Sequence, residues 1–83
     1  MRLDKFLQVS RLVKRRALAN SLCHAGRVTV NGRAAAPAAP VRPGDILAID
    51  VGMRRLRARV LVIPSGRPGR APCVDVLDEH PLM

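Results

Sequence analysis

One segment of seven residues, Gly26 to Gly32, constrains the fold of this chain more than any other feature of the sequence. Before Gly26 the apolar residues recur with helical spacing, whereas Val28 and Val30 alternate with polar residues as in a half-buried strand. Asn31-Gly32 follows directly and is the dipeptide most typical of a two-residue β-hairpin. A chain that ends a helix, forms a strand and reverses within so few residues is expected to be α+β.

Two short helices are predicted before this segment. Leu3, Phe6 and Leu7 have helical spacing, which predicts an amphipathic helix over residues 3–9. A second helix is predicted over residues 14–25, with Gly26 as its left-handed C-cap. Its apolar stripe is expected to hold Leu18, Leu22 and Ala25, with Cys23 as a small buried residue.

The rest of the chain reads as strands and turns. Strands are predicted over residues 33–35, 45–51 and 55–63, and the last of these carries Arg55, Arg57 and Arg59 on one face. That row is interpreted as a solvated strand face in preference to a binding site. Residues 1–63 are expected to form one domain, and residues 64–83 a loop over 64–72, a possible final strand over 73–77 and a flexible tail.

A chain of 83 residues is one small domain, which buries only roughly 60–65% of its unfolded surface and has little room for a deep catalytic cleft. The sequence shows no nucleophile with a base partner, no paired carboxylates and no cofactor motif, so we expect neither an enzyme nor a cofactor. Without a secretory signal or a long apolar stretch, we expect a cytoplasmic protein with no membrane partner. Cys23 and Cys73 are then expected to be free thiols, and their spacing with the histidines does not suit zinc.

The charge of the chain is concentrated near its N-terminus. The formal net charge is +9, and residues 1–33 hold eight basic residues and one acid. Thirteen of the fifteen basic residues are Arg, whose guanidinium group binds phosphate through a rigid bidentate fork. Clustering of this kind favours binding of a polyanion over the alternative of a basic face that only aids solubility.

The composition also indicates which nucleic acid is bound. Phe6 is the only aromatic residue, so recognition by stacking of single-stranded bases is disfavoured. Phosphate contacts and the shape of folded RNA are the expected basis of binding. A helix-turn-helix protein that binds DNA is the alternative, and competition between duplex DNA and ribosomal RNA separates the two.

Four motifs together resemble the S4 RNA-binding domain family, over roughly residues 1–51. They are Arg2-Leu3-Asp4, Arg16-Ala17-Leu18-Ala19, Gly26-Arg27-Val28-Thr29-Val30-Asn31-Gly32 and Pro43-Gly44-Asp45. The resemblance implies two short N-terminal helices packed on a small, bent, mostly antiparallel sheet, the alpha-L motif, with a basic surface for structured RNA. Many members place Ser or Thr at the start of the second helix, where this chain has Lys14-Arg15.

The N-terminal stretch 1–16 is similar to the small stand-alone S4 proteins of ribosome-associated quality control. The resemblance implies a monomeric factor that binds the large ribosomal subunit and contacts 23S rRNA and peptidyl-tRNA, while an RqcH-like protein adds alanine to the stalled chain. The alternatives are a heat-shock-type S4 protein that rescues obstructed large subunits, and another S4 module for structured RNA. Heat-shock-type members usually have Trp in the first helix, and this chain contains none.

Nine residues are the candidate RNA-binding site, and Arg16 is the one on which binding should depend most. Asp4 is the lone carboxylate among them, and it could favour the helix start, pair with an arginine such as Arg11, orient an arginine or accept a hydrogen bond from RNA. The candidates are Arg2, Asp4, Lys5, Arg11, Lys14, Arg15, Arg16, Arg27 and Arg33.

Overall fold

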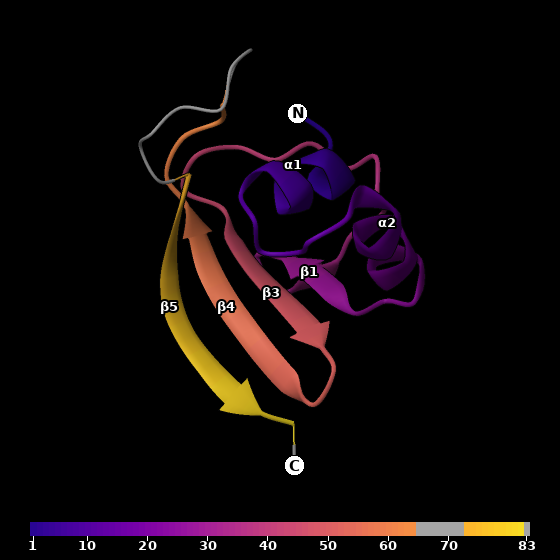
Figure 1. Ribbon diagram of the computed structural model, residues 1–83. Helices are drawn as coiled ribbons and strands as arrows, with labels where there is room; N and C mark the ends of the chain where they lie inside the picture. The colour runs from indigo at the N-terminus through magenta and orange to yellow at the C-terminus, as the bar shows by residue number, and fades with distance from the viewer. Residues whose placement is uncertain (65–72, 83) are drawn as a thin grey trace.

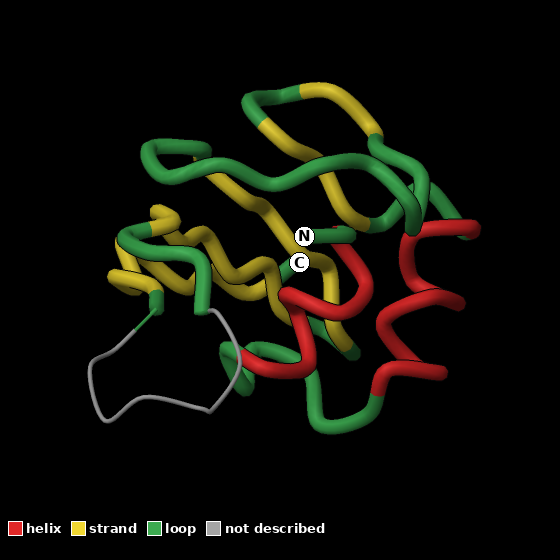
Figure 2. The backbone as a smooth tube through the Cα atoms, turned by 90° about the horizontal axis from the view of Figure 1, so that it is seen from above, coloured by secondary structure: helices red, strands yellow, loops and turns green. Residues whose placement is uncertain are grey.

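The computed structural model describes residues 1–64 and 73–82, and it has two helices on one side of a five-stranded antiparallel sheet (Figures 1 and 2). The predicted loop over 64–72 lies outside the described residues except for Pro64. The strand order is β2-β1-β3-β4-β5. The elements are α1 (Leu3–Val9), α2 (Arg16–His24), β1 (Val28–Val30), β2 (Arg33–Ala34), β3 (Ile46–Val51), β4 (Arg54–Val60) and β5 (Val74–Pro81).

The hydrophobic core lies between the helices and the inner face of the central strands. Helix α1 has the predicted bounds and buries Leu3, Phe6 and Leu7 completely. Strand β3, which faces the helices, contributes Leu47 and Ile49 to the core. These two residues alternate with less buried neighbours, as the pleat of a strand requires. The prediction of an α+β fold with this N-terminal core is confirmed.

Helix α2 differs from its prediction in length and in its buried face. It begins at Arg16 and ends at His24, so Lys14 precedes the helix and Arg15 is its N-cap. Leu18 is 45% exposed, and the buried residues are Ala19, Leu22 and Cys23. The prediction is therefore confirmed for Leu22 and Cys23 and wrong for Leu18 and Ala25, which are exposed. Ala19 takes the place of Leu18 in the core, and the small side chains of Ala19 and Cys23 let α2 lie close to α1 and the sheet.

The hairpin motif and the Pro-Gly-Asp motif meet in the fold. Asn31 and Gly32 both have positive φ, as a type I′ turn requires. The side-chain amide nitrogen of Asn31 donates to an Asp45 carboxylate oxygen at 3.1 Å. The Asn31 side-chain oxygen accepts the Ile46 amide proton at 2.9 Å, and the second Asp45 oxygen accepts that of Arg42 at 2.9 Å. These bonds fix the start of β3 against the end of β1.

Strands β4 and β5 form a long hairpin-like pair that extends beyond the helices (Figure 1). Strand β4 ends at Val60, three residues before the predicted end. Strand β5 runs to Pro81, well beyond the predicted 73–77, with an irregular register opposite Arg57 and Ala58. The expected tail is therefore part of the sheet as far as Pro81.

We predict that Phe6→Ala lowers the free energy of unfolding by about 3–5 kcal/mol, because it empties a fully buried site between the two layers. Leu61→Ala is the matched control, since Leu61 is 40% exposed and its loss should cost less than about 1 kcal/mol. Urea denaturation followed by circular dichroism measures both. Equal losses would contradict this location of the core.

Candidate nucleic-acid interface

A buried carboxylate joins the two helices at the basic end of the molecule. The side chain of Asp4 is almost fully buried, and its two oxygens lie 3.3 Å from Nε of Arg2 and 3.5 Å from Nε of Arg16. The second terminal nitrogen of Arg2 donates to Asp4 as well, at 3.3 Å. Arg2 is the N-cap of α1 and Arg16 the first residue of α2, so one carboxylate holds two arginines from different elements.

The environment of Asp4 keeps it ionised. Burial raises the pKa of its carboxyl, but hydrogen bonds and positive charge outweigh burial, so the pKa lies below its ordinary value. The groups that lower it are the Asn20 side-chain amide, the Lys5 backbone N–H, and the Arg2 and Arg16 guanidinium groups. At neutral pH the ionised Asp4 offsets the repulsion between two arginines that are each about half exposed.

The sequence left several roles open for Asp4, among them pairing with an arginine such as Arg11 and orienting an arginine. The structure buries Asp4 and pairs it with Arg2 and Arg16, whereas Arg11 lies past the end of α1 with a φ of 64°. Burial leaves Asp4 little surface for a direct contact with RNA, so its geometry is that of a residue that positions the two arginines.

Asn20 is a functional candidate that sequence reasoning missed. Its side-chain nitrogen donates to Asp4 at 3.4 Å and so helps to hold the carboxylate beneath the arginines. The sequence feature that could have indicated Asn20 is its spacing of four residues from Arg16, because this spacing places both residues on the same side of α2.

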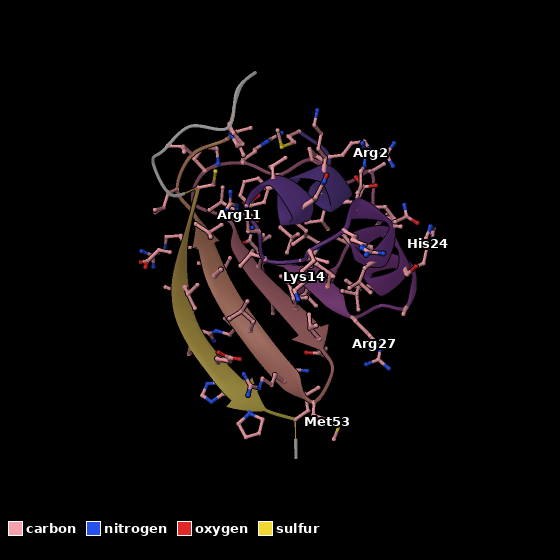
Figure 3. The ribbon with its side chains drawn as sticks, viewed as in Figure 1. Arg2, Arg11, Lys14, His24, Arg27 and Met53 are labelled. Atoms are coloured by element: carbon pink, nitrogen blue, oxygen red, sulfur yellow. The ribbon has the colours of Figure 1, made fainter. Side chains whose placement is uncertain are left out.

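The six other candidate residues are all exposed. Figure 3 shows Arg2, Arg11, Lys14 and Arg27 at separate places around the helices and the start of β1. Arg27 and Arg33 lie apart from the Asp4 cluster, since Arg27 precedes β1 and Arg33 begins β2. Within residues 1–64 and 73–82, the basic candidates that form no ion pair are Lys5, Arg11, Lys14, Arg15, Arg27 and Arg33.

The arginine row of β4 faces away from the helices and is largely neutralised. Arg55 donates to both oxygens of Asp50, at 2.7 and 3.2 Å, and the pKa of Asp50 is lowered first by this hydrogen bond. Arg57 lies 3.3 Å from Asp78 of β5, and Arg59 is paired in register with Asp75. These contacts favour the interpretation of the row as a solvated strand face.

The arrangement suits binding of phosphate better than catalysis. Two guanidinium groups fixed by one carboxylate retain terminal N–H groups that can donate to phosphate oxygens. The described part of the chain has no cluster of His, Cys, Asp or Glu residues suited to hold a metal ion. It also has no helix long and apolar enough to cross a membrane.

These features define an RNA-binding domain, and the comparison with known families agrees. Residues 1–47 match the S4 domain family, and the chain belongs to it. The matched segment contains both helices, the first hairpin and the Asp4 cluster.

Two relatives indicate which kind of S4 protein this chain is similar to. The RQC P-site tRNA stabilizing factor (RqcP) of Halalkalibacterium halodurans is 50% identical over 60 residues, which cover 72% of this chain and 68% of that protein. The factor of the same name from Helicobacter pylori strain J99 is 49% identical over 65 residues, or 78% of this chain and 77% of that one. These relatives and the S4 domain support an RNA-binding role in ribosome quality control.

A solved structure gives the fold independently. The trimeric structure of Vibrio cholerae heat shock protein 15 matches with a TM-score of 0.81 at 28% sequence identity, over 93% of this chain and 81% of that one. The expected S4 fold is therefore confirmed along almost the whole chain. The expectation of a monomer is not supported by this match, because that relative is trimeric in its structure.

We predict that Asp4→Asn lowers the free energy of unfolding by about 1–3 kcal/mol at pH 7, because two arginines lose their buried counter-charge. Since the native pKa of Asp4 is lowered, its contribution is complete above the unfolded value of about 3.9 and disappears as the pH falls through the native pKa. The difference between the two proteins should thus shrink in acid. Urea denaturation at a series of pH values tests this, and a pH-independent difference would contradict it.

Proposed function

We propose that this chain is a non-enzymatic RNA-binding factor of ribosome-associated quality control. It binds the large ribosomal subunit that carries peptidyl-tRNA, contacts 23S rRNA and the tRNA, and supports the addition of C-terminal alanine by an RqcH-like protein. Association with ribosomes places it in the cytoplasm. The observation that carries the proposal is the Arg2–Asp4–Arg16 cluster, which lies within the residues of this chain that match the S4 domain. The relatives of the chain named as P-site tRNA stabilizing factors support it.

In this mechanism, positively charged side chains bind phosphate groups and so hold the RNA in position. Arg2 and Arg16 bind phosphate where the backbones of rRNA and tRNA approach each other, and Asp4 with Asn20 keeps both arginines in place before RNA arrives. Two arginines that are ordered in advance lose less conformational entropy on binding than two free side chains. The exposed basic residues that form no ion pair, two of which lie apart from the cluster, extend the contact to further phosphates: Lys5, Arg11, Lys14, Arg15, Arg27 and Arg33.

A heat-shock-type role in rescue of obstructed large subunits is the second candidate, supported by the structural match to heat shock protein 15. The two roles differ in what they require. A quality-control factor of the first kind raises alanine addition by the RqcH-like protein, whereas a rescue factor of the second kind acts without it. A reconstituted tailing reaction with and without this chain separates them.

We predict that Arg16→Ala weakens binding to large subunits carrying peptidyl-tRNA by about 10- to 100-fold, as expected for loss of one charged hydrogen bond to phosphate. Arg59→Ala is the matched control, because it removes the same charge from the exposed outer face of β4. Co-sedimentation at one salt concentration, with empty subunits, whole ribosomes and duplex DNA as competitors, measures both. If the two variants lost the same affinity, binding would depend only on the net charge of the protein and not on the position of Arg16.

Salt should weaken the same complex steeply. With about six phosphate contacts, log K is expected to fall against log salt with a slope of about −4 to −5. Arg16→Ala should reduce the magnitude of that slope by about one, whereas Arg59→Ala should leave it unchanged. A salt-independent affinity of the wild-type chain would refute the electrostatic mechanism.

A further inference from the structure

The outer face of the sheet, which points away from the helices, is hollowed between β1 and β4. Leu47 and Ile49 of β3 belong to the core beneath the helices, so Ala48 between them points outward. Thr29 of β1 is the partner of Ala48 in register and points the same way. Because both side chains are small and larger ones surround them, a groove of about 300 Å³ is left. We call it the outer groove.

The rim of the outer groove next to β1 also lacks bulk. Gly26 precedes β1 and Gly32 follows it, and both line the groove. A Cβ atom at either position would meet nothing within 4 Å, so these two residues border open space. A ligand can therefore enter the outer groove from the β1 side without displacing a side chain.

Arg27 supplies an uncompensated positive charge at this rim. Its carbonyl oxygen accepts the Asp50 amide proton at 2.9 Å, so Arg27 lies opposite Asp50 at the start of β1. Both oxygens of Asp50 accept hydrogen bonds from Arg55, at 2.7 and 3.2 Å, and Arg27 forms no ion pair with any described residue. Figure 3 shows the Arg27 side chain extending away from the body of the protein. An exposed guanidinium group without a counter-ion suits a phosphate.

Arg55 supplies a flat surface to the same groove. Its Nε and one terminal nitrogen hold Asp50, so its charge is compensated and the edge of its guanidinium group is fixed. The side chain is 52% exposed, and RNA bases stack on guanidinium planes as they do on aromatic rings. A base that stacks there leaves the ion pair with Asp50 closed. Phe6, the only aromatic residue, is fully buried, so Arg55 takes the part of an aromatic ring here.

We propose that the outer groove binds one unpaired nucleotide of an RNA strand. The phosphate of this nucleotide lies at Arg27 and its base stacks on Arg55, above the floor formed by Thr29 and Ala48. A volume of about 300 Å³ is at the lower end of the range for small-ligand pockets, so it suits one nucleotide better than paired bases. The proposal goes beyond the function above, because it requires neither a ribosomal subunit nor tRNA.

Two other ligands use less of the outer groove. A carboxylate of an acidic peptide, or a phosphate of an RNA duplex, would contact Arg27 and leave the Arg55 plane and the floor unoccupied. The β1 side of the groove, from Gly26 to Gly32, also lies within the residues that match the S4 domain. Charge, shape and position in the chain therefore favour a nucleotide of RNA.

Nuclear magnetic resonance tests the location and the ligand. The isotope-labelled full chain is titrated with adenosine monophosphate, and separately with inorganic phosphate and with glutamate. We expect the nucleotide to shift the amide signals of Thr29, Ala48 and Arg55. Its affinity should exceed that of either simple anion by about tenfold, because only the nucleotide adds a stacked base.

A pair of RNA duplexes tests whether the nucleotide comes from an RNA strand. The two have the same paired sequence, and one carries a single bulged adenosine. We expect the wild type to bind the bulged duplex about tenfold more tightly. Ala48→Leu fills the floor of the groove without changing the charge, and Arg55→Ala removes the flat surface, so each should abolish this preference.

Arg54→Ala is the matched control for these variants. Arg54 is the neighbouring residue of Arg55 on the opposite face of β4, and it also forms an ion pair, with Glu79 at 2.8 Å. Its loss should leave the preference for the bulged duplex unchanged. The side chains at positions 48, 54 and 55 are directed away from the core centre or exposed, so thermal unfolding should show folded variants.

The contrary results are distinct from those that test the proposed function. Absence of nucleotide-dependent shifts at the outer groove, or equal affinity for inorganic phosphate or glutamate, overturns the nucleotide site. Equal binding of the two duplexes by the wild type overturns the assignment to RNA, and nucleotide-dependent shifts would then indicate a free nucleotide. Equal losses in Arg54→Ala and Arg55→Ala also overturn the proposal, since net charge would explain them. Arg16→Ala should weaken both duplexes alike, and its effect on large subunits tests the proposed function separately.

Discussion

Two helices of seven and nine residues cannot cover a sheet of five strands, and the rest of the structure follows from this mismatch. At about 1.5 Å per residue, α1 and α2 span roughly 10 and 14 Å, whereas the eight residues of β5 span roughly 26 Å. The apolar core is therefore confined to the end of the sheet that the helices reach. Beyond it, β3, β4 and β5 are held by main-chain pairing and by ion pairs between neighbouring strands, such as Arg57 with Asp78.

The N-terminus of helix α2 explains why a carboxylate is buried in so basic a protein. Helix α2 begins with Arg16, has Arg15 as its N-cap, and lacks both an acidic residue in its first turn and a capping side chain. Positive charge at a helix N-terminus is unfavourable, and Asp4 supplies from α1 the negative charge that α2 does not contain. The pairing makes Arg2 and Arg16 compatible with the fold and also orders them for a ligand. Stability of the helix junction and readiness to bind phosphate thus depend on one side chain.

Local patterns predicted the parts of the fold that depend on neighbouring residues. The bounds of α1 and the Asn31-Gly32 turn follow from spacing and from backbone preferences, and the structure confirms them. The exposure of Leu18 and the length of β5 depend on contacts between distant segments. At Leu77 a register shift turns the strand, so Asp78 faces Arg57 and the alternation of apolar residues that would reveal a strand is lost. For the site, clustering of charge indicated the basic end, but only the packing of α1 against α2 could show that Asp4 is buried and that Asn20 holds it.

Net charge is consequently a poor measure of the capacity of this chain to bind RNA. Arg55, Arg57 and Arg16 are the same chemical group, and in the sequence the β4 row looks as basic as the helix start. In the fold, Arg55 and Arg57 each face a carboxylate on an exposed strand, whereas Arg2 and Arg16 share one carboxylate between them. Arg2 and Arg55 each use Nε and one terminal nitrogen on a carboxylate, so the difference lies in the charge that is left: two arginines that share one carboxylate keep a net positive charge for a phosphate, and an arginine with a carboxylate of its own does not. The distribution of six acids among fifteen basic residues, more than the number of arginines, therefore determines where the protein keeps uncompensated positive charge.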